Sequence, residues 1–315
     1  MSRPAVAEAA AAYEGDVSPS RFVQAAVAPS RARDLITLTK PEITLLVVLS
    51  ALAGYALGTP DGANGLELFG LLVGTGLTSA GGAVFNHLYE RDHDATMRRT
   101  MNRPLPAGRV STTFAWRFGF GLTAAGLGLL CPTTNWQTAT LAIATVLLYI
   151  YVYTPLKRLT PANTLVGTIP GALPALGGYV AATGTFGGLG WAVFLLLVVW
   201  QMPHFLSLAW MYRKDYTRGG FEMTTRDDAT GTRTGLWIVA FTVLTVAASL
   251  LPVAMGRLGL GYGAAALALG VYFLVPTVRF LRGDRSNAEA KAILKASVMY
   301  VMLLVPVLAA FAWIG

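Results

Sequence analysis

Residues 67–94 read ELFGLLVGTGLTSAGGAVFNHLYERDHD, a long apolar stretch that runs into a cluster of charges. No charged residue lies between Leu68 and Phe85, and a helix needs about 20 mostly apolar residues to cross a bilayer. The stretch therefore predicts a membrane-spanning helix that ends in an acidic motif. The whole chain has a matching composition, because only 13% of its residues are charged, against about 25% in a soluble domain.

Eight further stretches have the length and apolar content of a membrane span. With the first, the expected spans are residues 42–59, 67–90, 112–131, 137–154, 163–182, 189–211, 234–254, 259–280 and 293–314. The sequence thus predicts an all-α, polytopic transmembrane bundle of about nine helices. Pro170, Gly171 and Pro174 interrupt the fifth span. Broken helices are tolerated at membrane depth only where they face protein or a cavity, so we expect this span to line a binding cavity.

Lys and Arg residues gather in alternate loops of this predicted topology. The segments before the first span and after the second, fourth, sixth and eighth spans hold nearly all 24 of them, whereas the opposite loops hold only Arg257. Cytoplasmic loops carry such an excess, so we expect the N-terminus in the cytoplasm and the C-terminus outside. A membrane explains the net charge of +8, and we expect no nucleic-acid partner.

The first part of the chain differs from the rest in composition. Residues 1–34 are rich in Ala, Ser and Arg and lack the apolar run of a secretory signal. Glu8, Glu14 and Asp16 argue against a mitochondrial presequence, which is poor in acidic residues. We therefore expect residues 1–34 to be a disordered cytoplasmic tail and residues 35–315 to form one intramembrane domain.

The acidic motif at the end of residues 67–94 has the spacing of a ligand set. Asn86, Glu90 and Asp94 follow at intervals of four, so they share one helical face over roughly 12 Å. Their oxygens suit Mg²⁺ that also holds a substrate phosphate. Arg99 and Arg103 follow, and cations beside carboxylates indicate a polyanion between them. The alternative is a solvated helix end with its own ion pairs, but carboxylates at a membrane helix end are usually functional.

A second polar segment, at 200–216, combines a proline, a histidine and an aspartate. His204 follows Pro203 within a predicted span, and Asp215 lies eleven residues further on. Eleven residues make about three helical turns, so a continuous helix would place both side chains on one face, with His204 about 16 Å deeper. His204 is either a site residue or a histidine that packs against a neighbouring helix, and the residues alone leave both open.

Four segments resemble the UbiA superfamily of intramembrane prenyltransferases, and more closely its haem O synthase subgroup. They are TKPEIT at 39–44, NHLYERDHD with RTMNRPL at 86–105, YTPLKRLTPANTLVGTIPGALP at 153–174, and WQMPHF with RKDY at 200–216. The resemblance runs from about Leu38 to the C-terminus. Two positions depart from the superfamily pattern: Glu90 stands where many members have Asp, and Met211 stands at the first position of the DxxxD motif that ends at Asp215.

The resemblance implies a UbiA-type bundle and a prenyl transfer reaction. The implied substrates are farnesyl diphosphate and haem B: the farnesyl group passes to a vinyl group of protohaem, water adds, and haem O results for haem A and terminal oxidase biogenesis. A bacterial inner membrane location and a downstream haem A synthase are implied too. An aromatic or quinone prenyltransferase remains the nearest alternative, and a membrane transporter a more distant one.

The resemblance and the residue chemistry together assign roles to eleven residues. The expected metal ligands, for Mg²⁺, are Asn86, Glu90, Asp94 and Asp215. The expected phosphate contacts are Arg99, Arg103, Lys157 and Arg158, and these eight residues form the predicted catalytic set. The residues expected to contact haem are His204, Asn163 and Tyr216.

Overall fold

The computed structural model describes residues 30–59 and 62–314, and within these residues the protein is built of helices without strands. Nine of the helices there are long and apolar enough to cross a membrane, which confirms the predicted multi-pass bundle. These spans are Pro41–Gly58, Gly65–Asp94, Thr112–Thr133, Trp136–Leu156, Asn163–Thr183, Gly188–Met211, Thr232–Ala254, Leu260–Arg282 and Asn287–Trp313.

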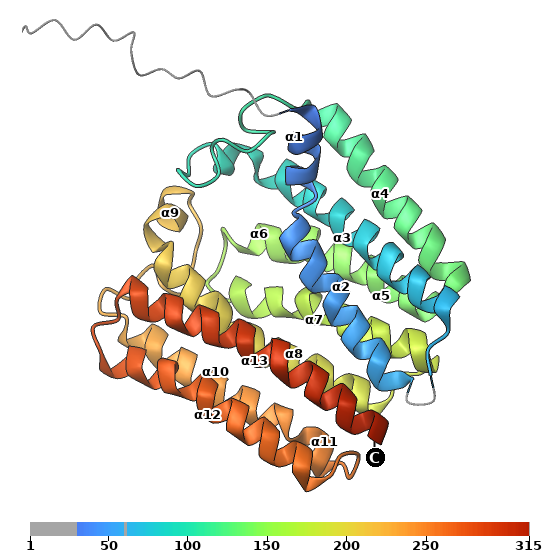
Figure 1. The fold of residues 1–315 in the computed structure, drawn as a ribbon. Helices are drawn as coiled ribbons and strands as arrows, with labels where there is room; N and C mark the ends of the chain where they lie inside the picture. The colour runs from blue at the N-terminus through green and yellow to red at the C-terminus, as the bar shows by residue number, and fades with distance from the viewer. Residues whose placement is uncertain (1–29, 60–61, 315) are drawn as a thin grey trace, which may run out of the picture.

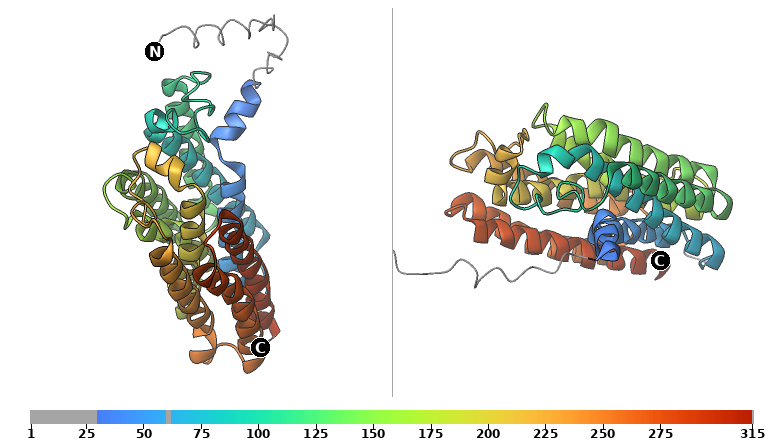
Figure 2. Two further views of the ribbon diagram at one scale, coloured as in Figure 1. Left: turned by 90° about the vertical axis from the view of Figure 1, so that its left-hand side faces the viewer. Right: turned by 90° about the horizontal axis from the view of Figure 1, so that it is seen from above.

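The long helices lie side by side along one common direction (Figures 1 and 2). They are α2 (Pro41–Gly58), α3 (Gly65–Asp94), α4 (Thr112–Thr133), α5 (Trp136–Leu147), α7 (Asn163–Thr183), α8 (Gly188–Met211), α10 (Thr232–Ser249), α12 (Leu260–Arg282) and α13 (Asn287–Ile314). The short helices are α1 (Arg31–Leu38), α6 (Thr154–Leu156), α9 (Arg213–Arg218) and α11 (Leu251–Ala254), with a π-helix, η3 (Leu148–Tyr153), between α5 and α6. In Figure 1, α1, α9 and the loop after α3 lie at one end of the bundle, and α13 finishes at the other.

Small residues allow α2 and α7 to pack backbone against backbone. A Cβ atom added at Gly54 would lie 1.8 Å from the carbonyl oxygen of Ala175, and one at Gly178 would lie 1.8 Å from that of Ala51. Membrane helices have little hydrophobic drive to associate, so close contact of this kind is what holds them together. The contact fixes α2, and the residues just before it, against the centre of the bundle.

The fifth span is continuous, so the expectation of a broken helix is wrong. Pro170 and Pro174 both lie inside α7. A neighbouring helix adds a polar contact, because the side-chain amide of Gln201 on α8 donates to the carbonyl of Thr168 at 3.1 Å. A larger residue at Gly171 would collide with Gln201. This span therefore serves as a packed internal helix.

The start of the described chain belongs to a helix. Residues 31–34, which we expected in the disordered tail, form the first turn of α1, and Ser30 caps it by accepting from the N–H of Arg33. Asp34 is buried and forms a two-pronged ion pair with Arg109 at 2.9–3.1 Å. Residues 1–29 of the expected tail lie outside the described residues.

Candidate active site

Three oxygen-bearing side chains lie on the last turns of α3, and we call Asn86, Glu90 and Asp94 the α3 stripe. All three are buried. Each meets one cation from a different segment: Lys40 Nζ lies 2.5 Å from Asn86 Oδ1, Lys157 Nζ lies 2.7 Å from Glu90 Oε1, and Arg103 Nη1 lies 2.7 Å from Asp94 Oδ2. The structure thus brings the predicted Arg103 and Lys157 to the stripe, and adds a third cation.

Lys40 is a site residue that the sequence reasoning missed. It directly precedes α2, with a left-handed backbone (φ 45°, ψ 64°) that non-glycine residues rarely adopt. Such strained positions cluster at functional sites. Burial lowers the pKa of Lys40 to about 7, with Arg103 and Lys157 acting in the same direction against the carboxylates. The one signal for this role in the sequence was its place in the TKPEIT segment.

The pKa of Lys157 is shifted in the direction opposite to that of Lys40. Burial alone would lower the pKa of Lys157, but Glu90 and the nearby tyrosines hold that pKa above its usual range. Its ammonium group also lies 4.5 Å from the ring centre of Tyr153. A permanent cation therefore stands at the middle of the α3 stripe.

Several buried polar atoms beside the stripe have no hydrogen-bond partner in the described structure. Asp94 Oδ1 and both ring nitrogens of His87 are buried without a hydrogen-bond partner in the described structure, and His87 Nδ1 lies 3.9 Å from Asp94 Oδ2. Carboxylate and amide oxygens are the donors that Mg²⁺ prefers, so this donor set fits the ion. Among the described residues no three His, Cys, Asp or Glu side chains converge on one point, so the four-residue ligand set stays a prediction.

Asp215 belongs to a separate group. It lies on α9 and pairs with Arg218 of the same helix at 3.0 Å. No hydrogen bond or ion pair in the described residues joins it to the α3 stripe. A backbone break at Tyr212 separates α8 from α9, so the straight helix assumed in relating Asp215 to His204 is absent.

The other two predicted phosphate contacts lie among aromatic rings. The guanidinium of Arg99 lies 4.9 Å from the ring centre of Tyr212 and 5.3 Å from that of Tyr216. Arg158 lies 2.8 Å from His93 Nε2 and donates to the hydroxyl of Tyr89 at 3.3 Å. Neither makes a hydrogen bond to the α3 stripe in this state.

The loop after α9 packs on the same end of α3. The ring of Phe221 is buried and lies 6.0 Å from the ring of His93 and 5.9 Å from Lys157 Nζ. The N–H of Glu222 donates to the carbonyl of Lys157 at 2.6 Å. Asn163 holds this arrangement, because its side-chain nitrogen donates to the Glu222 carbonyl at 2.6 Å. Asn163, expected at haem, is thus fully engaged in fixing the loop.

His204 contacts the last helix. Its Nδ1 lies 2.9 Å from the hydroxyl of Ser297 on α13, and its ring centre lies 5.5 Å from that of Trp200. These contacts give the residue a packing role. Its other ring nitrogen makes no hydrogen bond within the described structure, so one polar face of the imidazole remains available.

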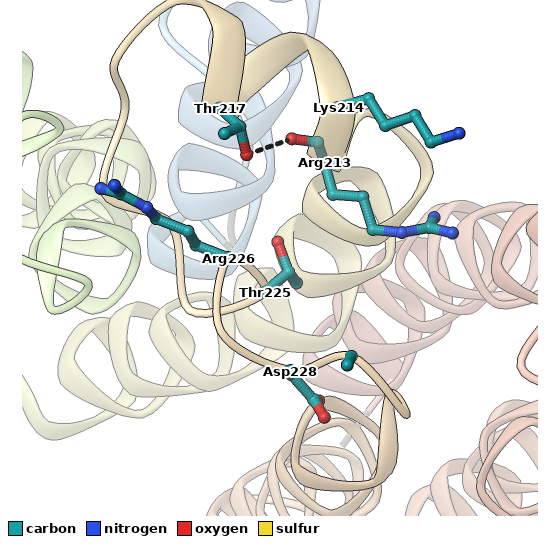
Figure 3. Close-up of a pocket in the computed structure, with 7 residues that line it drawn as sticks. Arg213, Lys214, Thr217, Thr225, Arg226 and Asp228 are labelled. Carbon is teal, nitrogen blue, oxygen red and sulfur yellow. Dashed lines mark hydrogen bonds between the residues drawn. The ribbon is translucent and has the colours of Figure 1, made fainter.

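A surface hollow lies beside α9 (Figure 3), and no residue of the α3 stripe lines it. Its lining residues are Arg213, Lys214, Thr217, Thr225, Arg226, Asp228 and Ala229. Arg213 donates to the carbonyl of Trp210 at 2.7 Å, Arg226 pairs with Glu222, and Asp228 is bonded to the start of α10. These side chains join α8, α9 and α10, and we assign the hollow a structural role.

Comparison with known proteins identifies similar sequences over nearly the whole chain. A model of the UbiA prenyltransferase family matches residues 47–313. The protoheme IX farnesyltransferase of Salinibacter ruber is 50% identical over 275 residues, which cover 87% of this chain and 97% of that protein. The protoheme IX farnesyltransferase of Solibacter usitatus is 39% identical, with 86% and 96% covered.

Solved structures show the same fold at low sequence identity. A digeranylgeranylglyceryl phosphate synthase superposes with a TM-score of 0.75 at 16% identity, covering 90% of this chain and 99% of its own. A UbiA homologue of Archaeoglobus fulgidus, bound to GPP and Mg²⁺, superposes with a TM-score of 0.65 at 18% identity, covering 89% and 99%.

Proposed function

The chain belongs to the UbiA prenyltransferase family, and within it to the protoheme IX farnesyltransferases, and on this premise we propose how its site carries out farnesyl transfer. It is a multi-pass membrane enzyme. Its donor substrate is farnesyl diphosphate and its acceptor is haem B, with a vinyl group as the alkylated position and haem O as the product. The bacterial inner membrane is the proposed location, with the N-terminus in the cytoplasm and haem A synthase downstream.

The α3 stripe carries the proposal. It sets three buried ligand oxygens against three cations within hydrogen-bond distance. Neither the ligands nor the cations alone would suit a magnesium–diphosphate complex, which has both positive and negative parts. A UbiA homologue of A. fulgidus bound to a prenyl diphosphate and Mg²⁺ supports this use of the site.

We assign each group a task in breaking the bond between farnesyl carbon and diphosphate oxygen. Asn86, Glu90 and Asp94 would hold Mg²⁺, which neutralises charge on the leaving diphosphate when it is bound. Lys40, Lys157 and Arg103 would turn from the stripe to the diphosphate oxygens, which keep the electron pair of the broken bond. Arg99, Arg158 and Asp215 are proposed to complete the contacts at the rim.

The allylic cation then reacts with the acceptor. The vinyl group of haem B supplies the electron pair of the new carbon–carbon bond, and water adds to the resulting cation with loss of a proton. A dry interior protects the first cation from premature water, and the closely packed helices provide it. We propose that His204 contacts haem through its free ring nitrogen, with Tyr216 nearer the rim, whereas Asn163 acts through the loop that it fixes.

Product formation tests the proposal directly. Membranes that contain the protein are incubated with haem B, farnesyl diphosphate and Mg²⁺, and haem O is measured by liquid chromatography with mass detection. We expect haem O with Mg²⁺ and none after thorough chelation with EDTA. Farnesylation of a quinone precursor without haem O would contradict the acceptor, and full activity after chelation would contradict the metal.

A further inference from the structure

Thr154 links the α3 stripe to the backbone of another span. It lies where the π-helix η3 gives way to α6, and its side chain is buried. Its hydroxyl donates to the carbonyl of Tyr149 at 2.7 Å. The side-chain nitrogen of Asn86 donates to that same hydroxyl oxygen at 3.1 Å.

These two bonds determine which way the Asn86 amide points. A hydroxyl group has one proton, and here the Tyr149 carbonyl takes it, since a carbonyl can only accept. The hydroxyl oxygen of Thr154 can then only accept a hydrogen bond from Asn86. The nitrogen end of the Asn86 amide must therefore face Thr154. The oxygen end of Asn86 is thereby turned towards Lys40, at 2.5 Å, and into the site.

The widened turn of η3 places the hydroxyl. The Tyr149 carbonyl also accepts the backbone N–H of Thr154, five residues further along, which is the π-helical pattern. Pro155 follows, and in α-helical geometry its ring would meet the carbonyl of Tyr151, four residues before it. The π turn removes this clash and directs Thr154 towards α3, and single π turns recur at functional sites.

We propose that Thr154 is a positioning residue, which holds the Asn86 amide with its oxygen towards the metal–diphosphate complex. The inference rests on the proposed function, because it takes Asn86 as an oxygen ligand. Asn86 needs such control because a flipped amide would turn N–H protons to a cation. Glu90 and Asp94 have two oxygens each and need no equivalent of Thr154.

Metal binding to the whole protein in detergent tests the assignment without relying on turnover. Mn²⁺ serves as the probe, with the unreactive analogue farnesyl S-thiolodiphosphate, and free Mn²⁺ is counted by electron paramagnetic resonance. Thr154→Val keeps the shape and removes the hydroxyl, and we expect about tenfold weaker Mn²⁺ binding, as is typical when a ligand loses its outer partner. Thr154→Ser should restore wild-type affinity.

A matched control comes from the same span. The hydroxyl of Thr145 on α5 donates only to the carbonyl of Leu141 in its own helix, so Thr145→Val should leave Mn²⁺ affinity unchanged. Thr154→Ala tests the same bond should the Val variant fail to fold. Equal losses in Thr145→Val and Thr154→Val would overturn the proposal, because the effect would then be a general one of the helix.

Asn86→Asp provides the decisive background. An aspartate has oxygens at both ends, so its orientation no longer matters, and adding Thr154→Val should change Mn²⁺ affinity by less than about twofold. A tenfold loss in both backgrounds, or none in either, overturns the role of Thr154. Asn86→Ala distinguishes failure of the proposed metal site from failure of the Thr154 role. Unchanged Mn²⁺ binding in Asn86→Ala refutes the ligand set itself. Weakened binding in Asn86→Ala with unchanged binding in Thr154→Val refutes only the role of Thr154.

Discussion

At the scale of single residues, the ion pairs of the α3 stripe compensate the burial of two carboxylates in a membrane protein. Burying a charged group costs several kcal/mol unless a partner and hydrogen bonds compensate it. Glu90 and Asp94 have such partners in Lys157 and Arg103. Substitutions here must therefore preserve shape and hydrogen bonding to be informative about chemistry.

Amide substitutions of the two carboxylates meet that condition. Glu90→Gln and Asp94→Asn keep the side-chain volume but remove the charge that would hold Mg²⁺, so we expect haem O formation to fall by about 100-fold or more. The product assay measures this, and size-exclusion chromatography of the solubilised protein checks that each variant folds.

The same helix offers a control for this prediction. Asp92→Asn changes a side chain that is 81% exposed and paired with Arg91, and it should leave product formation near the wild-type rate. Near-normal activity in Glu90→Gln or Asp94→Asn would remove that carboxylate from the metal site.

His204 separates haem recognition from the diphosphate site. We expect His204→Ala to weaken haem binding roughly tenfold, because the ring nitrogen lone pair that would contact haem is lost, and to leave farnesyl diphosphate binding intact. Haem titration followed in the Soret band measures the first, and a diphosphate-binding assay the second. Ser297→Ala removes the bond at Nδ1 but keeps the imidazole, so it should preserve haem affinity. Unchanged haem affinity in His204→Ala would return the residue to packing.

The sequence predicted the α3 stripe because its spacing of four is a local property of one helix. It predicted two of the three cations beside the stripe, Arg103 and Lys157. Lys40 was missed because it lies 46 residues from Asn86, and only the packing of α2 in the bundle brings the two together. Thr154 was missed for the same reason, since its role depends on a contact between two spans.

At the scale of elements, the start of α10 depends on one buried carboxylate. Asp228 accepts from the backbone N–H and the hydroxyl of Thr234, both at 2.7 Å. Burial alone would raise the pKa of Asp228, but these bonds hold that pKa below its ordinary value. Its contribution to stability is therefore full above about pH 4, the usual aspartate value, and is lost as the pH falls through the lower folded value.

We expect Asp228→Asn to destabilise the protein by about 1 kcal/mol at pH 7, similar to the loss of a helix cap. Thermal unfolding in detergent, followed by tryptophan fluorescence, should show a decrease on the order of 2 °C. The difference from wild type should shrink at acid pH, where Asp228 is protonated in both states. Asp227→Asn, at the exposed neighbouring position, should have no effect, and equal destabilisation by both variants would contradict the assigned bond.

Span positions could be predicted because bilayer thickness sets the length of an apolar helix. The positions at which helices break could not be predicted. The prolines of α7 suggested a break, yet tertiary contacts keep that helix continuous, whereas the break at Tyr212 has no proline to mark it.

At the scale of the whole molecule, α1 is the first helix of the described chain, and Asp34 within it pairs with Arg109. Residues 1–29 lie outside the described residues, and removing them should leave haem O formation near the wild-type rate, because their sequence is rich in Ala and has no long run of large apolar residues. Removal of residues 1–34 also deletes Asp34 and leaves Arg109 without its carboxylate partner. We expect the longer deletion to unfold at a lower temperature, and equal behaviour of both deletions would show that this ion pair has no role in stability.

The pairing of every α3 stripe residue with a cation bears on the order in which ligands arrive. A bare divalent ion would have to separate the two carboxylates from Lys157 and Arg103, and a bare diphosphate would have to separate the basic side chains from the stripe, so each alone breaks pairs that it replaces only in part. A preformed magnesium–farnesyl diphosphate complex can exchange for all three pairs in one event. Initial rates should then follow the concentration of that complex, with free Mg²⁺ and free farnesyl diphosphate acting as weak competitors.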